Sequence, residues 1–432
     1  MGKSPYANGG KLRQDPNLPP RWETYAVDVP TPGTIKTSSV IAFSHYLRDT
    51  IANSRAKRNF RIVSPDELES NRLGAVFEAT NRAYVWPIKP TDEHLSPDGL
   101  VMEMLSEHTC QGWLEGYLLT GRHGLFPCYE AFVAIIDSMV NQFSKFLKQA
   151  KEIPWRVPIS SLNYLLTSEG WRQDHNGFSH QMPGFIDELI TKKASMVRIY
   201  LPPDANCLLQ TMDHVLWSTN YINLVIANKQ PELQWLTKEQ ALDHCRRGAS
   251  IWTWASTDDG ANPDLVMAAA GDLTTLEMMA AVWLLKRDAP ELRVRVVNVT
   301  DLMVLDTQAE HPHGLTEEAF EALFTADRTV IFNFHGYPQA VRALLFERLN
   351  VARFQTNGYR EEGTTTTPLD MMIRNGTSRY DLVMQAVQAS SRIAPNKVVA
   401  ILEKYQRKLK EHRAYIVEHQ DDPPEIKEWT WT

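Results

Sequence analysis

Short apolar runs alternate with amphipathic helical segments twice along the chain, and this alternation restricts the fold more than any other feature. The first set of strands is expected near residues 60–63, 125–126, 158–167, 196–201 and 221–227, and the second near residues 265–270, 294–299 and 329–334. Strands that alternate with helices are typical of βαβ units, which build parallel sheets with right-handed crossovers. We therefore predict the α/β class, with two doubly wound domains and mainly parallel sheets.

Apolar residues spaced by three and four positions predict the helices. They are expected over residues 40–51, 107–121, 129–148, 276–286, 317–324, 340–347, 380–390 and 396–412. Residues 1–39 are rich in Pro, Gly and Asn, and residues 230–262 lose the alternation and carry many charges. The predicted organisation is a lead-in segment over 1–39, a first domain over 40–229, a linker over 230–262 and a second domain over 263–432.

The composition excludes several classes of partner and location. The 432 residues carry a formal net charge of -7, and no run of like charges marks a tail for nucleic acid or membranes. No apolar run approaches membrane-spanning length, and the N-terminus has no apolar core of a signal peptide. The four cysteines form no Cys-x-x-Cys pair, which argues against a zinc ribbon and fits reduced thiols. We expect a cytoplasmic protein without nucleic-acid or membrane partners.

The segment over residues 106–124 carries the first candidate for chemistry. Glu107 stands at the entrance of a predicted helix, where free amide groups and the helix dipole favour a carboxylate. From spacing alone, capping of the helix is the simpler interpretation. Tyr129 and Phe132 are three residues apart on a predicted helix, so both rings could reach one pocket or form part of a core stripe.

Residues 171–181 form the densest polar cluster of the chain. The cluster follows a predicted strand at its carboxyl end, where open α/β sheets place their ligand sites. A metal site is disfavoured because Gly177 interrupts any helical face and no third group of ligands is evident. Recognition of a sugar phosphate by His175, Asn176 and His180 is better supported, and His180 could also move protons.

The turn over residues 271–274 lies between a predicted strand and a predicted helix. Gly271 and Asp272 could cradle an anion at the start of the helix, and capping of the helix explains the same pattern equally well. Four consecutive threonines over residues 364–367 have no physical role that the sequence reveals.

Five segments in consistent order carry a likeness to a known family. They are residues 69–73, 106–124, 153–161, 171–181 and 361–368. Together they resemble the phosphoketolases, thiamine diphosphate enzymes related to transketolase. The likeness covers nearly the whole chain but corresponds to the C-terminal half of a family about twice as long, and residues 4–10 resemble the segment that joins its first two domains. It implies a transketolase-like pyrimidine-binding domain followed by a C-terminal α/β domain.

The resemblance also implies roles for individual residues. Glu107 would be the acid that hydrogen-bonds the pyrimidine N1′, and Phe132 would stack on the pyrimidine ring beside Tyr129. His175 and His180 would take part in catalysis. The side chains expected to bind the ketose phosphate are Ser70, Arg72, Tyr129, Gln173, His175, Asn176 and Lys229.

The reaction implied by the resemblance is that of a lyase. Xylulose 5-phosphate or fructose 6-phosphate would be cleaved with inorganic phosphate to acetyl phosphate and a shorter aldose phosphate. The family holds the diphosphate through Mg²⁺ with a Gly-Asp-Gly motif, which this sequence lacks. The chain alone is therefore expected to hold no metal and to be inactive without an N-terminal phosphoketolase domain, and dimerisation is implied. The alternatives are a non-catalytic sugar-phosphate-binding or regulatory remnant and a transketolase-type transferase.

Overall fold

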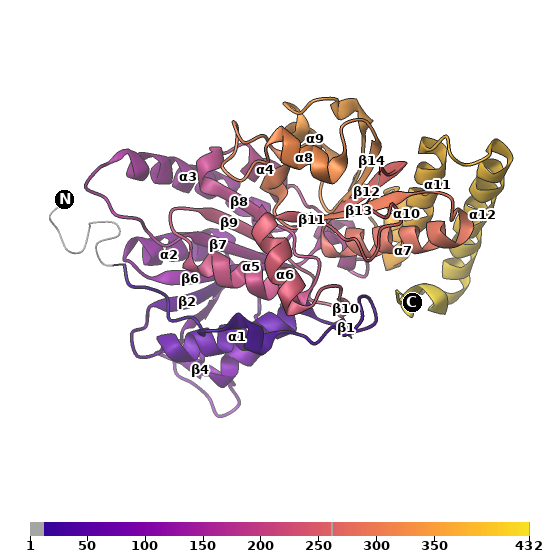
Figure 1. Ribbon diagram of the computed structural model, residues 1–432. Helices are drawn as coiled ribbons and strands as arrows, with labels where there is room; N and C mark the ends of the chain where they lie inside the picture. The colour runs from indigo at the N-terminus through magenta and orange to yellow at the C-terminus, as the bar shows by residue number, and fades with distance from the viewer. Residues whose placement is uncertain (1–12, 261, 432) are drawn as a thin grey trace.

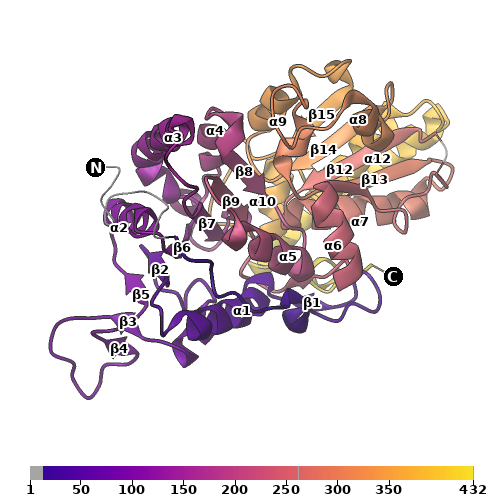
Figure 2. The same ribbon diagram turned by 60° about the vertical axis from the view of Figure 1, so that its left-hand side comes forward.

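The computed structural model describes residues 13–260 and 262–431, and its first domain is built on an eight-stranded sheet. The strand order is β4-β3-β5-β2-β6-β7-β9-β8, and the pairings of its named strands are parallel. The strands are β2 Phe60–Ser64, β3 Arg82–Ala83, β4 Leu95–Ser96, β5 Val101–Glu103, β6 His123–Tyr129, β7 Leu162–Ser168, β8 Val197–Tyr200 and β9 Ile222–Ile226. Figure 2 shows β3 and β4 at the edge of this sheet that lies away from the second domain.

Helices cover both faces of this sheet. They are α1 Ser39–Ser54, α2 Glu107–Leu119, α3 Asp137–Glu152, α4 Phe185–Ile190 and α5 Ala205–Trp217. Neighbouring strand residues point to opposite faces, so Ile62 and Leu125 enter the core under α1 and α5, and Val63 and Phe126 enter the core under α2 and α3. The prediction of a doubly wound domain is confirmed for the first half of the chain.

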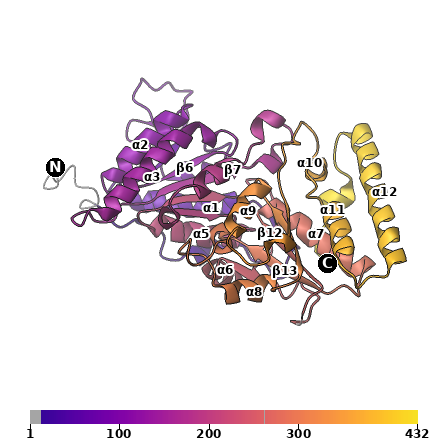
Figure 3. The same cartoon turned by 90° about the horizontal axis from the view of Figure 1, so that it is seen from above.

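The second domain is built on a five-stranded sheet of order β11-β13-β12-β14-β15. Its strands are β11 Ala249–Ile251, β12 Leu265–Ala270, β13 Val294–Val299, β14 Thr329–Phe334 and β15 Phe354–Asn357. β11 is antiparallel to β13, and the other pairs are parallel. The helices are α6 Lys238–Arg247, α7 Asp272–Asp288, α8 Glu317–Phe324, α9 Pro338–Leu345, α10 Pro368–Arg374, α11 Arg379–Ala389, α12 Pro395–His419 and α13 Pro424–Lys427. Figures 1 and 3 show α7, α11 and α12 as successive layers on one side of this sheet.

Several boundaries differ from the sequence prediction. The helix predicted from residue 129 begins only at Asp137, because β6 continues to Tyr129 and pairs there with Ser168 of β7. A 3-10 helix, η3 Val133–Ile136, fills the interval. The helix predicted from residue 276 begins at Asp272, so the turn over 271–274 is its first turn.

The segments predicted as lead-in and linker contain ordered structure. Strand β1 Lys36–Thr37 pairs with β10 Glu232–Leu233, which ties the lead-in to the predicted linker. The predicted linker also holds α6 and β11, and β11 extends the second sheet. The likeness noted over residues 4–10 lies outside the described residues.

Candidate functional site

The candidate side chains all follow the carboxyl ends of adjacent parallel strands. Ser70 and Arg72 follow β2, and Glu107 follows β5. Tyr129 ends β6. The cluster over residues 171–181 follows β7, and Lys229 follows β9. Because β5, β2, β6, β7 and β9 are neighbours in this order, the candidates lie along one edge of the sheet, the usual ligand edge of open α/β domains.

Three aromatic rings and an ammonium group form the centre of this edge. The ring centroids of Phe132 and His180 are 5.0 Å apart, and those of Tyr129 and Phe132 are 6.0 Å apart. Lys229 Nζ donates to the Tyr129 hydroxyl at 3.2 Å and lies 4.5 Å from the centroid of that ring. The structure therefore brings together four candidates, although Tyr129 and Phe132 do not share a helix.

The polar cluster over residues 171–181 is held in place by the second domain. Asn176 Nδ2 donates to Gln173 Oε1 at 2.8 Å, and the Gln181 amide donates to the carbonyl oxygens of Gln173 and Thr364. The backbone N–H of Thr366 donates to the carbonyl of Asp174 at 3.3 Å. The threonine run, whose role the sequence did not reveal, therefore anchors this loop. His175 is exposed.

The loop that carries Ser70 and Arg72 also reaches the centre of the edge. Thr167 of β7 donates its hydroxyl to the Asn71 side chain, and its carbonyl accepts from the backbone N–H of Lys229. Ser70 itself bonds within its own turn, to Asp66 and to the carbonyl of residue 67. Arg72 is exposed, with a backbone φ of 59°.

Glu107 lies in the first turn of α2, which Ser106 caps by accepting from the backbone N–H of Thr109. The carboxylate is half-buried, next to the thiols of Cys110 and Cys128. Burial, together with the Glu107 charge, raises the pKa of Cys110 to about 12 and that of Cys128 well above its ordinary value. Since Cys128 immediately precedes Tyr129, Glu107 approaches the same edge of the sheet as the aromatic rings.

A buried acidic cluster that the sequence analysis missed lies between the two domains. Glu130 and Glu169 come from the first domain, and Asp272 and His335 from the second. His335 Nε2 lies 2.6 Å from Glu130 Oε1, and His335 Nδ1 lies 3.5 Å from Glu169 Oε2. Glu130 also accepts from the backbone N–H of Gly170 at 2.7 Å, so the cluster supports the start of the polar loop.

Burial controls the protonation of this cluster. It is the main cause that raises the pKa of Glu169 well above its ordinary value, and the charges of Asp272 and Glu130 add to it. Burial also raises the pKa of Asp272. Burial alone would lower the pKa of His335, but the Glu130 and Asp272 carboxylates outweigh it and raise that pKa. The arrangement favours a protonated Glu169 beside a cationic His335.

The turn over residues 271–274 takes part in this domain contact. The Asp272 carboxylate accepts from the backbone N–H groups of Asn228 and Leu273 at 2.8 and 2.7 Å. Gly271 has a φ of 110°, and a Cβ there would lie 2.7 Å from the Cβ of His335. Glycine is therefore required both by the backbone conformation and by the close approach of β14. The sequence feature that could have pointed to this contact is the Gly271-Asp272 pair at a strand-to-helix turn.

Several large apolar side chains lie exposed near the candidate edge. Leu105, just before Glu107, is 89% exposed, and Phe178 in the polar loop is 77% exposed. Trp113 and Ile135 are also exposed. Among the described residues, no group of three acidic, histidine or cysteine side chains has the arrangement to hold a metal ion. No helix of the described ranges combines the length and apolar character needed to cross a bilayer.

Two family models match the chain in succession. One, described as "D-xylulose 5-phosphate/D-fructose 6-phosphate phosphoketolase", matches residues 41–218, and the other, "XFP C-terminal domain", matches residues 229–431. A "Probable phosphoketolase" of Rhodopseudomonas palustris (strain HaA2) is 54% identical over 431 residues, which are 100% of this chain and 55% of that protein. The chain thus spans about half the length of the curated relatives it matches.

Two solved structures share the fold at low identity. Transketolase from Leishmania mexicana is 15% identical with a TM-score of 0.61, over 87% of this chain and 48% of that chain. A chain described as "Split gene transketolase, inactive beta4 tetramer" is 12% identical with a TM-score of 0.53, over 83% of this chain and 99% of its own length. The fold is therefore that of the transketolase-like α/β proteins, and the sequence matches together identify the chain as a member of the phosphoketolase family.

Proposed function

We propose that this chain forms the pyrimidine-binding and C-terminal parts of a phosphoketolase. The complete enzyme would cleave xylulose 5-phosphate or fructose 6-phosphate with inorganic phosphate, giving acetyl phosphate and an aldose phosphate. The observation that carries the proposal is the alignment of the candidate side chains along one sheet edge, centred on Tyr129, Phe132, His180 and Lys229. Four free thiols, Cys110, Cys128, Cys207 and Cys245, fit a reducing cytoplasm.

The residues at this edge fit the pyrimidine half of thiamine diphosphate. A flat, partly apolar ring suits the aromatic group of Phe132, Tyr129 and His180, and a carboxyl group suits a ring nitrogen. When bound, thiamine diphosphate supplies a carbon nucleophile that attacks the ketose carbonyl. In this proposal Mg²⁺ and the diphosphate would be held by the other half of the enzyme, as the family resemblance implies.

The chain's own residues have distinct tasks in this proposal. Glu107 exchanges a proton with the pyrimidine nitrogen N1′, and Phe132 holds the ring by stacking. His175 and His180 move protons at the hydroxyl and carbonyl oxygens of the sugar, because imidazole changes charge near neutral pH.

The phosphate group of the ketose needs several cationic or polar donors. Arg72 can form a bidentate contact with phosphate oxygens, and Lys229 adds a point charge from the carboxyl end of β9. Ser70, Gln173 and Asn176 supply further hydrogen bonds. The Tyr129 hydroxyl, which accepts from Lys229, holds the ammonium group in the site.

An N-terminal phosphoketolase half is the expected partner, in a homodimeric enzyme. Leu105, just before Glu107, and Phe178, in the polar loop, are large apolar side chains that are exposed at this edge, and they suit contact with a further domain. A further argument comes from the split-gene transketolase chain, which matches this fold over 99% of its length and is itself described as inactive.

The test is an acetyl phosphate assay on the purified chain. The chain receives thiamine diphosphate, Mg²⁺, xylulose 5-phosphate and phosphate, with and without an N-terminal phosphoketolase half that carries the Gly-Asp-Gly motif. We expect acetyl phosphate only when both halves are present. Turnover by the chain alone would contradict the division of the site, and a non-catalytic role would follow if no partner restored turnover. Formation of a longer ketose from an added aldose phosphate would indicate a transketolase-type transferase instead.

A further inference from the structure

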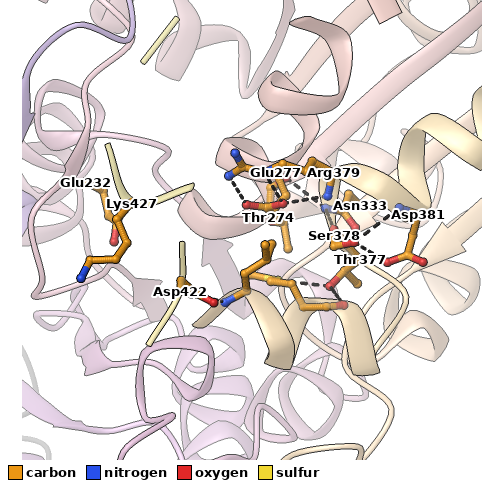
Figure 4. Close-up of polar contacts among 12 residues, drawn as sticks. Glu232, Thr274, Glu277, Asn333, Thr377, Ser378, Arg379, Asp381, Asp422 and Lys427 are labelled. Atoms are coloured by element: carbon orange, nitrogen blue, oxygen red, sulfur yellow. Dashed lines mark hydrogen bonds and ion pairs between the residues drawn. The ribbon is translucent and has the colours of Figure 1, made fainter. Parts of the chain in front are cut away.

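A cavity of about 250 Å³ lies at the junction of the two domains, outside the candidate site. Its walls come from β1, β10, the 3-10 helix η4 Gly170–Arg172, and the helices α7, α10, α11 and α13 of the second domain. Figure 4 shows the paired Glu277 and Arg379 on one side of this region and Glu232 and Lys427 on the other. The volume lies just below the range of about 300–1,000 Å³ for drug-sized ligands, so the cavity suits a small molecule.

Three cationic groups at this cavity have unused hydrogen-bond donors. Arg172 pairs with Glu232 through Nη1, and Arg379 pairs with Glu277 through Nε and Nη2. Within the described residues, Nη2 of Arg172 and Nη1 of Arg379 have no hydrogen-bond partner. Lys36 Nζ donates only to the backbone carbonyl of Lys427. Each group can therefore still donate to a ligand.

Among the cations of this cavity, Lys36 is the one without an ion pair to any carboxylate in the described part of the chain. The Lys36 side chain is exposed overall, but partial burial at the cavity lowers its pKa, and the nearby charges of Arg172 and Arg379 lower it further, while Glu428 opposes them. A bound anion would relieve both the desolvation and the repulsion. The cationic and acidic side chains that line the cavity nearly balance, so Lys36 is distinguished by its lack of an ion-pair partner within the described ranges rather than by a surplus of positive charge.

Asp422, the third acid that lines the cavity, makes its hydrogen bonds to other parts of the second domain. Asp422 accepts from the Thr367 hydroxyl at 2.6 Å, from the backbone N–H of Leu369 at 2.9 Å, and contacts His412 Nε2 at 2.8 Å. Lys427 pairs with Asp421 on the outer side. Since Glu232 and Glu277 are each paired with one arginine, the Lys36 ammonium group is left for a ligand.

The remaining wall of the cavity is apolar. It is formed by Leu273, Leu276, Leu369, Met372, Ile426 and Trp429. An inorganic ion would leave this wall without contact, whereas an aromatic or branched apolar group would cover it. We propose that this cavity binds a small organic anion, with one phosphate or carboxylate group held by Lys36, Arg172 and Arg379 and an apolar group against the apolar lining, where the centroid of the Trp429 ring lies 5.3 Å from the Arg379 guanidinium.

A ligand here would act on the candidate site through Arg172. The neighbouring residue Gln173 belongs to the polar loop, and its backbone N–H donates to the carbonyl of Gly170 at 3.2 Å. Glu232, the partner of Arg172, also accepts from Asn228 at 3.3 Å, one residue before Lys229. An anion that competes with Glu232 for Arg172 would weaken the Arg172–Glu232 ion pair. Because this pair adjoins both the polar loop and the turn of Lys229, the anion would alter the positions of both segments without entering the candidate site.

The test measures binding by isothermal titration calorimetry, independently of turnover. The probes are phenyl phosphate, benzoate, inorganic phosphate and benzyl alcohol, and the chain is compared with Lys36→Met, Lys36→Arg and Leu276→Trp. The control Lys238→Met removes an exposed lysine on α6, and Arg72→Ala removes a cation of the candidate site. Thermal unfolding checks that each variant is folded.

We expect phenyl phosphate or benzoate to bind at this cavity more tightly than inorganic phosphate, and benzyl alcohol not to bind. Lys36→Met should weaken binding about ten- to a hundred-fold, the range of one charge-assisted hydrogen bond, and Lys36→Arg should largely keep it. Leu276→Trp should block it, and Lys238→Met should leave it unchanged. Equal affinity of the wild-type chain and Lys36→Met would overturn the proposal, as would loss of binding in Arg72→Ala, which would assign the anion to the candidate site.

Discussion

Replacement of Glu169 by glutamine tests the buried cluster between the domains. Glu169 is completely buried, and its pKa is raised well above the ordinary value by burial and by the charges of Asp272 and Glu130. The folded chain therefore holds a proton that the unfolded chain releases above the ordinary glutamate pKa of about 4.3. Because the native state binds more protons than the unfolded state, the contribution of Glu169 to the free energy of unfolding falls as the pH rises.

The size of this pH dependence follows from the one extra proton that Glu169 binds in the native state. Each pH unit above the unfolded pKa costs up to about 1.4 kcal/mol of folding free energy until Glu169 ionises in the native state. Glutamine cannot ionise and has a similar shape, so Glu169→Gln removes this cost. The difference in unfolding free energy between the variant and the wild type should be flat below about pH 4.5 and should rise by up to about 2.8 kcal/mol over the next two pH units. His335 is present in both chains, and its contribution largely cancels.

The assay is urea unfolding from about pH 3.5 to about pH 8, so that it covers both sides of the ordinary glutamate pKa. It is followed by tryptophan fluorescence, because Trp171 lies against His335 at this domain contact. Glu318→Gln on α8 is the matched control, since Glu318 is exposed. The control should run parallel to the wild type at all pH values. Parallel curves for Glu169→Gln and the wild type would refute the reasoning, because they would mean that Glu169 binds no extra proton in the native state.

Three further predictions, one of them with a matched glycine substitution as its control, test other parts of the structure. In the enzyme reconstituted from both halves, Glu107→Gln should lower acetyl phosphate formation about a hundred- to ten-thousand-fold with an unchanged unfolding temperature, and near-normal turnover would remove Glu107 from catalysis. Arg72→Ala should weaken ketose phosphate binding in calorimetry far more than it alters thermal unfolding, because Arg72 is exposed. Gly271→Ala should lower stability by at least about 1 kcal/mol through its positive φ and the contact with His335, whereas Gly116→Ala in α2, with open space around it, should raise stability by about 1 kcal/mol.

The elements with strong local signals were predictable from the sequence. The bounds of β12 and α8 agree with the prediction, because a continuous apolar run and a capping threonine before two acids are local patterns. The helix predicted over residues 129–148 begins later than predicted, at Asp137, and no local sequence pattern shows why. Tyr129 is held in β6 by pairing with Ser168, 39 positions later in the chain, and this pairing overrides the helical spacing.

The site was predictable only in part for a similar reason. The polar loop and Lys229 follow strands, so strand order alone places them at one edge of the sheet. The acidic cluster unites residues 130, 169, 272 and 335 from two domains, and each acid taken singly resembles a surface charge. Only the packing of the domains shows that Glu130 and His335 contact each other directly.

The second domain acts on the candidate site by positioning the loop over residues 171–181 at both ends. Trp171 Nε1 donates to the carbonyl of His335 at 2.8 Å, and Gln181 donates to the carbonyl of Thr364 at 3.2 Å. The candidate side chains of this loop lie between these two anchors, so their positions depend on a domain that carries none of the candidates itself. Arg172 provides a third anchor through Glu232, in the predicted linker. Separating the domains would therefore leave the sheet edge with Tyr129 intact and release the loop, which makes the domain contact part of the site's geometry.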